Sequence, residues 1–172
     1  LDIKDNQLVD SSSGVTVPVD PANSINSGNT TNWFTAAISG TVYTDEGVTT
    51  MGSGRTVRLL VNGVDSGLTG TTDASGNYSI ANATITSEDI VTVFLDNATE
   101  DGVTVSIAAS NDFQNLDIYQ NFLTVRSETG TDVANLFLDT GHNGDSDITA
   151  IYTNGGSSTL TTASGKTLLV NA

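Results

Sequence analysis

A regular alternation of apolar and polar residues, interrupted by turn formers, is the feature that most constrains how residues 38–80 fold. In residues 38–44 and again in residues 56–61, every second residue is apolar or small, so each run can turn one face toward a core. Residues 73–76 (DASG) then supply turn formers directly before residues 77–80 (NYSI), where an aromatic residue favours a third strand. This pattern predicts an all-β fold of sandwiched sheets.

Two short motifs in this stretch, G-x-V at residues 40–42 and T-D-x-x-G-x-Y at residues 72–78, resemble a known kind of module. They are similar to the prealbumin-like, carboxypeptidase-regulatory-type modules of bacterial cell-surface proteins. The resemblance covers residues 36–110 and implies a β-sandwich at an extracellular or cell-surface location. It implies no particular ligand.

Residues 111–172 carry shorter runs with closely spaced turn signals, which predict a second small β module. Short strands are expected at residues 116–119, 122–126, 133–138, 148–152, 158–161 and 167–170, with a helical turn as the alternative for residues 133–138. The pattern resembles, more loosely, Ig-like modules repeated along giant bacterial surface proteins. A β module of this size is marginal alone, so we expect it to dock on the first module, on the N-terminal arm or on a neighbouring molecule. The expected architecture is two small β-sandwich modules, prealbumin-like and Ig-like, preceded by an extended arm.

Residues 1–35 are expected to form that arm. Two runs in it alternate apolar and polar residues, and their apolar positions are Leu1 and Ile3 in the first run and Val15, Val17 and Val19 in the second. Pro18 has no N–H to donate, which restricts the second run to an edge or an extended segment. In one interpretation the arm is a frayed terminus or a linker folded back on its own domain. In the other, the second run adds as a strand to an open sheet of a neighbouring copy.

The balance of charge and the absence of cysteine exclude several classes of function. Twenty acidic residues against five Lys and Arg give a net charge of -15, so a nucleic acid or an anionic membrane surface would repel the chain. No apolar run approaches the length of about 18 residues that a membrane span needs. Without cysteine there is no disulfide, thiol nucleophile or zinc–thiolate site. Sixteen of the acids are Asp, which favours turns, so helix should be scarce.

Residues 90–95 (IVTVFL) are apolar on both faces. This predicts a central strand that is covered on both sides, either by the chain itself or, on one face, by a second subunit.

One acidic loop is a candidate calcium site, and its oxygen-bearing residues are Asp139, Asn143, Asp145 and Asp147. Carboxylate and amide oxygens at alternate positions of a Gly-containing loop suit calcium, although the loop departs from the EF-hand pattern. The alternative is a solvated acidic turn. His142, the only histidine, lies in the same loop without a nucleophile motif, so we expect no catalytic residues and no enzymatic activity.

The sequence contains candidate residues for two kinds of covalent modification. N-x-S/T sequons occur at Asn29, Asn77, Asn82 and Asn97, and they matter only if the source glycosylates secreted proteins. An intramolecular isopeptide bond is excluded within residues 38–110, which contain no lysine, and Lys166 is the remaining candidate in the C-terminal part.

Two functions remain after these exclusions. The first is a structural subunit of an extracellular filament or surface assembly, a homopolymer in which the N-terminal arm bridges one copy to the next. The second is an adhesin or carbohydrate-binding module, in which aromatic side chains stack on a glycan, namely Trp33, Tyr43, Tyr78, Tyr119 and Tyr152. Trp33 has the alternative role of a plug over the end of the sandwich.

Overall fold

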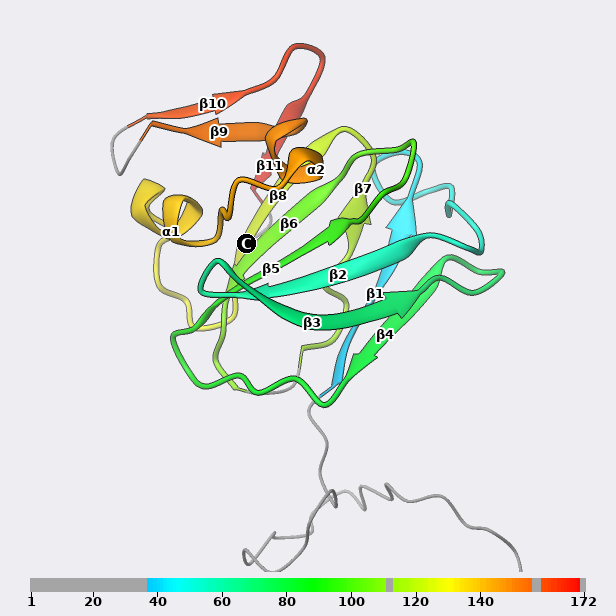
Figure 1. Cartoon of the computed structure of the whole chain (residues 1–172), viewed down its shortest axis with the longest axis horizontal. Coiled ribbons are helices and arrows are strands. Elements are labelled where there is room, and N and C mark those ends of the chain that lie inside the picture. The colour runs from blue at the N-terminus through cyan, green and yellow to red at the C-terminus, as the bar shows by residue number, and fades with distance from the viewer. Residues whose placement is uncertain (1–36, 111–112, 156–158, 171–172) are drawn as a thin grey trace, which may run out of the picture. The chain divides into compact units, whose positions relative to one another are not determined.

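The computed structural model describes residues 37–110, 113–155 and 159–170 (Figure 1). The arm residues 1–36, including Leu1, Ile3, Val15, Val17 and Val19, lie outside the described residues. The described part contains eleven strands and two short helices, which confirms the all-β prediction. In chain order they are β1 (Ala37–Tyr43), β2 (Thr56–Val61), β3 (Val64–Thr71), β4 (Asn77–Ala81), β5 (Ile90–Leu95), β6 (Val103–Ile107), β7 (Ile118–Tyr119), β8 (Phe122–Ser127), α1 (Asn135–Thr140), α2 (Ser146–Thr149), β9 (Tyr152–Asn154), β10 (Leu160–Thr162) and β11 (Thr167–Val170).

A six-stranded sheet forms the middle of the fold, with the strand order β11-β8-β6-β5-β2-β3. Strands β3, β2, β5 and β6 are antiparallel neighbours, whereas β8 runs parallel to β6 and β11 runs parallel to β8. Asn62 and Gly63 join β2 to β3 in a two-residue turn with φ values of 51° and 73°. Positive φ at both positions is what a tight hairpin of this kind requires.

A second sheet, of three strands in the order β4-β1-β7, packs against one face of the six-stranded sheet. The hydrophobic core between them is drawn from both sheets and from the segment before β7, and its largest buried members include Ile38, Leu59, Ile80, Phe113, Leu116 and Ile118. This pair of sheets is the sandwich that the alternating pattern of residues 38–80 predicted.

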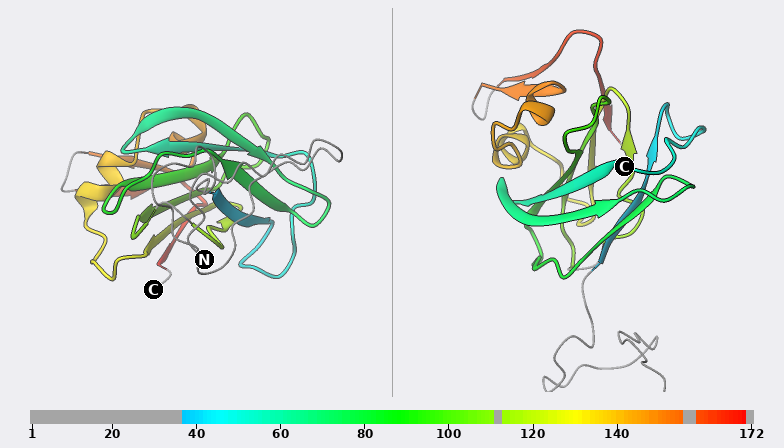
Figure 2. Two further views of the ribbon diagram at one scale, coloured as in Figure 1. Left: turned by 90° about the horizontal axis from the view of Figure 1, so that it is seen from below. Right: turned by 45° about the vertical axis from the view of Figure 1, so that its right-hand side comes forward.

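The C-terminal segment of α1, α2, β9 and β10 covers the other face of the six-stranded sheet. A second core forms there from Phe94 and Ile90 of β5 and from helix and strand residues that include Leu138, Ile148 and Tyr152. Figure 2 shows this segment on one side of the sheet and β1 on the other. All six residues of β5 are buried, so the central-strand prediction is confirmed, and the chain itself covers both faces.

The expected boundary between residues 110 and 111 falls inside this arrangement. Strands β8 and β11 belong to the same sheet as β2, β3, β5 and β6, and residues 36–172 form one unit. The structure therefore replaces the expected modules 36–110 and 111–172 with a single sandwich that carries a third layer. The hydroxyl-bearing residues Thr104 and Ser106 of β6 are fully buried as well, on the face opposite to the second core, where the Thr104 hydroxyl donates to the Asp117 carbonyl at 2.6 Å.

Two segments of the C-terminal layer differ from the strands expected there. Residues 135–140 form α1, which agrees with the helical alternative for residues 133–138. Residues 146–149 form α2 instead of the start of a strand at 148, because the Asp145 side chain caps the helix by accepting the Asp147 N–H. Among the described residues, no helix is long and apolar enough to cross a membrane.

Candidate subunit interface

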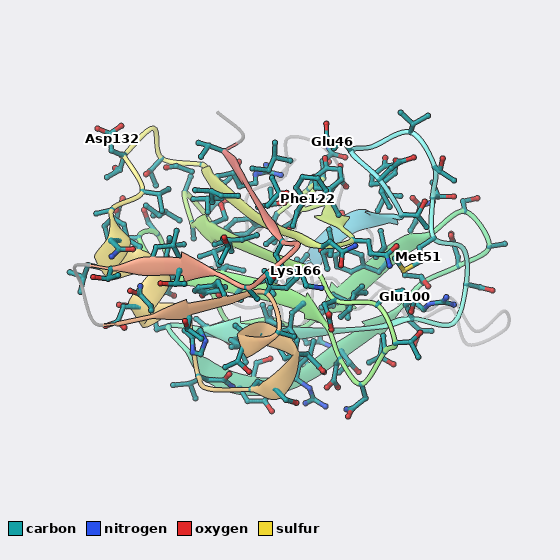
Figure 3. The ribbon with its side chains drawn as sticks, turned by 90° about the horizontal axis from the view of Figure 1, so that it is seen from above. Glu46, Met51, Glu100, Phe122, Asp132 and Lys166 are labelled. Atoms are coloured by element: carbon teal, nitrogen blue, oxygen red, sulfur yellow. The ribbon has the colours of Figure 1, made fainter. Side chains whose placement is uncertain are left out.

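Strand β11 is held at its start by a partly buried ionic cluster. Lys166 Nζ donates to Asp101 Oδ2 at 2.8 Å and to Asn121 Oδ1 at 2.7 Å, and the Lys166 side chain is mostly buried. The Thr167 N–H then donates to the Asn121 carbonyl at 3.0 Å, which begins the parallel pairing of β11 with β8. Figure 3 shows Lys166 close to Phe122, the first residue of β8. These bonds fix where the last strand enters the sheet.

The same cluster bears on the isopeptide hypothesis for Lys166. The hypothesis needs a lysine on one core strand that faces an Asn or Asp on another, whereas Lys166 precedes β11 and its partner Asp101 lies in the loop before β6. The Asn121 side chain also lies at the surface rather than in a core. We therefore interpret the cluster as a noncovalent anchor of β11.

The outer edge of β11 is open in the described part of the chain, where β8 is its one strand partner. Leu168 and Val170 stand in register with Leu123 and Val125 of β8, so they extend the face that forms the second core. They are nevertheless 42% and 69% exposed, respectively. An open strand edge with exposed apolar side chains and no charge is the kind of edge that pairs with another chain.

An apolar groove of about 520 Å³ opens over these two residues. Its floor is the sheet, its walls are α1 with the loop before it and β10, and its apolar lining residues are Val125, Val133, Leu138, Leu160, Leu168 and Val170. Asp132, labelled in Figure 3, lies on the loop that borders the groove. A groove of this volume is within the range of sites that bind ligands or peptide segments.

Hydrogen bonds from β9 hold the α1 wall of the groove in place. The Tyr152 hydroxyl donates to the Leu138 carbonyl at 3.0 Å, and Asn154 Nδ2 donates to the Asn135 carbonyl at 2.9 Å. Burial raises the pKa of Tyr152, so its hydroxyl keeps its proton and remains a donor. The wall is therefore built before any partner arrives.

The other sheet edges are less suited to accept a strand. Strand β3 carries Asp65 and Gly67, and its register with β2 shifts between Arg58 and Leu60. A Cβ on Gly70 of β3 would lie 2.6 Å from the Ser79 carbonyl oxygen of β4, so the edges of these two strands approach each other closely. Strand β7 has only two residues. Among the described edges, β11 is the one that combines apolar exposure with an adjoining groove.

The candidate calcium loop uses its side-chain oxygens within the protein. Asn143 Oδ1 accepts the Asp145 N–H at 3.0 Å, Asp145 Oδ1 accepts the Asp147 N–H at 2.9 Å, and Asp147 Oδ2 accepts the Asn97 N–H at 2.7 Å. Asp139 lies on α1. Within the described ranges, no group of three or more His, Asp and Glu side chains has a metal-binding arrangement. The loop is an acidic capping turn in this structure.

His142 has a structural role in the same loop. Its Nδ1 accepts the Gly144 N–H at 3.0 Å, which leaves Nε2 to donate to the Tyr152 carbonyl at 3.3 Å. The imidazole packs edge-on against the Tyr152 ring.

We expect the melting temperature to be the same after treatment with EDTA and after addition of calcium. The reason is that a ligand stabilises a protein only when the folded state binds it, and the loop oxygens already accept N–H groups. Differential scanning fluorimetry checks this, with Asp139→Ala as a control that removes one candidate ligand. A rise of several degrees in calcium that Asp139→Ala abolishes would restore the calcium hypothesis.

The four tyrosines of the carbohydrate hypothesis are placed in two ways. Tyr78 and Tyr152 are buried, and their hydroxyls donate to main-chain carbonyls. Tyr43 and Tyr119 stack on each other, with ring centroids 5.4 Å apart, so each covers one face of the other. Tyr78 and Tyr152 thus cannot stack on a glycan, and Trp33 lies outside the described residues.

Three of the four sequon asparagines, Asn77, Asn82 and Asn97, are exposed, and Asn29 lies outside the described residues. Their glycosylation stays a prediction.

Comparison with known proteins found no matching family model, no matching curated protein and no matching solved structure. The candidate interface therefore rests on the residues of this chain alone.

Proposed function

We propose that this protein is a non-enzymatic structural subunit of an extracellular filament or surface assembly, whose copies are joined by β-strand addition of the N-terminal arm. The observation that carries the proposal is the open edge of β11, where Leu168 and Val170 expose apolar side chains beside a groove. An added strand supplies main-chain hydrogen bonds to such an edge, and its side chains fill the adjoining pocket.

The arm has the sequence of a strand that could serve this purpose. Val15, Val17 and Val19 alternate with Thr16 and Pro18, which is the period of a strand with one apolar face. The extracellular location is supported by the resemblance of residues 36–110 to prealbumin-like modules of surface proteins.

The arm is tested by two substitutions at neighbouring positions, Val17→Asp and Thr16→Asp. Both add one negative charge, but in a strand the two side chains point to opposite faces. We expect the wild-type protein to form polymers that lengthen with concentration, Val17→Asp to stay monomeric, and Thr16→Asp to polymerise like the wild type. Sedimentation velocity and negative-stain microscopy measure this at a salt concentration of about 0.15 M, where repulsion between acidic copies is screened beyond about 8 Å.

Deletion of residues 1–20 removes both alternating runs of the arm and should leave monomers. Wild-type protein that stays monomeric at every concentration tested would contradict the proposed function, as would a truncated protein that still assembles.

A further inference from the structure

We infer that the groove beside β11 receives residues 15–19 of another copy, which add to the six-stranded sheet as a seventh strand. This inference rests on the proposed function and names the acceptor surface, which the function alone leaves open. Three features of the chain lead to it: the direction of the main-chain groups of the arm, the face of its valines and its lack of charge.

The position of Pro18 decides which residues of the arm can pair with β11. Each residue in a strand directs its N–H and C=O to the same side, and neighbouring residues direct theirs to opposite sides. If Val15, Val17 and Val19 bond to β11, then Thr16 and Pro18 direct their main-chain groups away from it. The missing N–H of Pro18 then costs no hydrogen bond, and it leaves an outer edge on which a further strand pairs poorly. A single arm would therefore cover the edge of β11, and no further strand would add to the sheet beyond it.

The same arrangement places the apolar side chains of the arm on one face. Val15, Val17 and Val19 are two residues apart, so their side chains lie together. Leu168 and Val170 point to the face over which the groove opens. With the valines on that face, the arm covers the exposed apolar surface of β11 and meets the Leu160 wall of the groove. Main-chain pairing and side-chain burial then occur in a single event.

The occupant is a segment of this chain because its charge and its reach suit the groove. Two copies of a chain with a net charge of -15 repel each other, yet residues 11–19 carry no charge. Residues 20–36, which separate the valines from β1, could span up to about 60 Å if extended. A folded unit of this size has a radius of gyration of about 14 Å, so the arm is long enough to reach a neighbouring copy.

The arm and the groove are different surfaces of one molecule, so the contact between copies is head-to-tail. Head-to-tail contacts that do not close into a ring produce open chains. This predicts a filament in which every copy gives one arm and accepts one.

The test uses four full-length proteins: the wild type, Val170→Asp, Val64→Asp and Val17→Asp. Val170 and Val64 are equally exposed, at 69% and 68%, but they lie on β11 and β3, the two opposite edges of the same sheet. We expect Val170→Asp to raise the concentration at which polymers appear by at least about tenfold, because an uncompensated charge would face the valines of the arm. Val64→Asp should polymerise like the wild type. Melting temperatures equal to that of the wild type, measured below the concentration at which polymers appear, would show that folding is intact in both variants.

A mixture of two defective proteins gives the sharper result. Val17→Asp retains an intact groove and Val170→Asp retains an intact arm. At a concentration at which the wild type polymerises and Val170→Asp does not, each variant should be monomeric alone. Mixed in equal amounts, they should form a dimer that does not grow, because the remaining arm and the remaining groove in that dimer are both defective. Sedimentation velocity separates this dimer from monomers and polymers.

The other outcomes overturn the inference in distinguishable ways. If Val170→Asp polymerises like the wild type while Val17→Asp does not, the arm joins copies at another surface, and the proposed function survives without this groove. If the wild type is monomeric, and Val17→Asp and Val170→Asp each lower the melting temperature, the arm occupies the groove of its own molecule. If Val17→Asp and Val170→Asp both polymerise like the wild type, neither the arm nor the groove joins the copies.

Discussion

A fragment of residues 36–110 is expected to remain unfolded, although it contains everything that the sequence assigned to the first module. It would lack β8, which pairs with β6, and β7, which pairs with β1. It would also lack Phe113, Leu116 and Ile118 from the core between the two sheets and the entire layer that covers the second core. The apolar faces of β5 and β6 would then be open to water. We expect a far-ultraviolet circular dichroism spectrum without strand signal and an amide proton spectrum without dispersion.

The matched control for this experiment is the fragment of residues 36–172, which retains both cores and should unfold in one cooperative transition. A well-dispersed spectrum and a cooperative transition for residues 36–110 would contradict the single unit and reinstate two separate modules.

Phe94→Ala is expected to destabilise the protein by about 3–5 kcal/mol. Phe94 is fully buried on β5, in the core that the C-terminal layer closes. Truncation of a buried aromatic side chain loses its transfer free energy and leaves a cavity that the surrounding side chains fill only in part. Since a domain of this size has a total stability of about 5–15 kcal/mol, the loss would be a large share of it. Urea denaturation followed by circular dichroism measures the change.

Val64→Ala is the control, because Val64 is an exposed residue of the same sheet. Its truncation should lower the free energy of unfolding by less than about 0.5 kcal/mol. A change below about 1 kcal/mol for Phe94→Ala would mean that the C-terminal layer does not close over β5.

The sequence was sufficient to predict strands whose pattern is local. The expected strand at residues 167–170 coincides with β11, and residues 90–95 form the doubly buried β5. Both predictions depend on runs of β-favouring apolar residues, which act through burial wherever the strand lies in the sheet. Asp73 likewise forms the predicted turn before β4, since its carboxylate accepts the N–H groups of Ser75 and Asn77. These two bonds lower the pKa of Asp73.

Two elements were missed although local signals for them exist. Strand β3 follows Asn62-Gly63, and an Asn-Gly pair between two runs is a strong signal of a hairpin. The alternation in β3 is weak because most of its residues are exposed, so the turn is the more informative signal. Helix α2 also has a signal, since Asp145 is a favoured N-cap, but a helix of one turn is too short for its periodicity to show.

The remaining features depend on pairings between distant residues. Three consecutive apolar residues in β11, from Leu168 to Val170, indicate burial, yet β11 lies at an edge where two of them are exposed. The order of strands in a sheet depends on where each loop leads, and the single-sequence pattern does not contain it. The groove therefore could not be predicted from the sequence. The alternating valines of the arm, by contrast, could be recognised as a strand pattern.

The parallel pairing of β6, β8 and β11 also determines when the groove comes into being. Parallel neighbouring strands need long connections between them. The chain loses entropy when it closes these loops, before the strand pairing stabilises it, so sheets of this kind fold slowly. Every wall of the groove comes from residues 125–170, so it appears only once the last strand has joined the sheet. In the proposed assembly, a copy that has not finished folding has no acceptor for the arm of a neighbour, so a chain that it joins through its own arm would stop growing at that end.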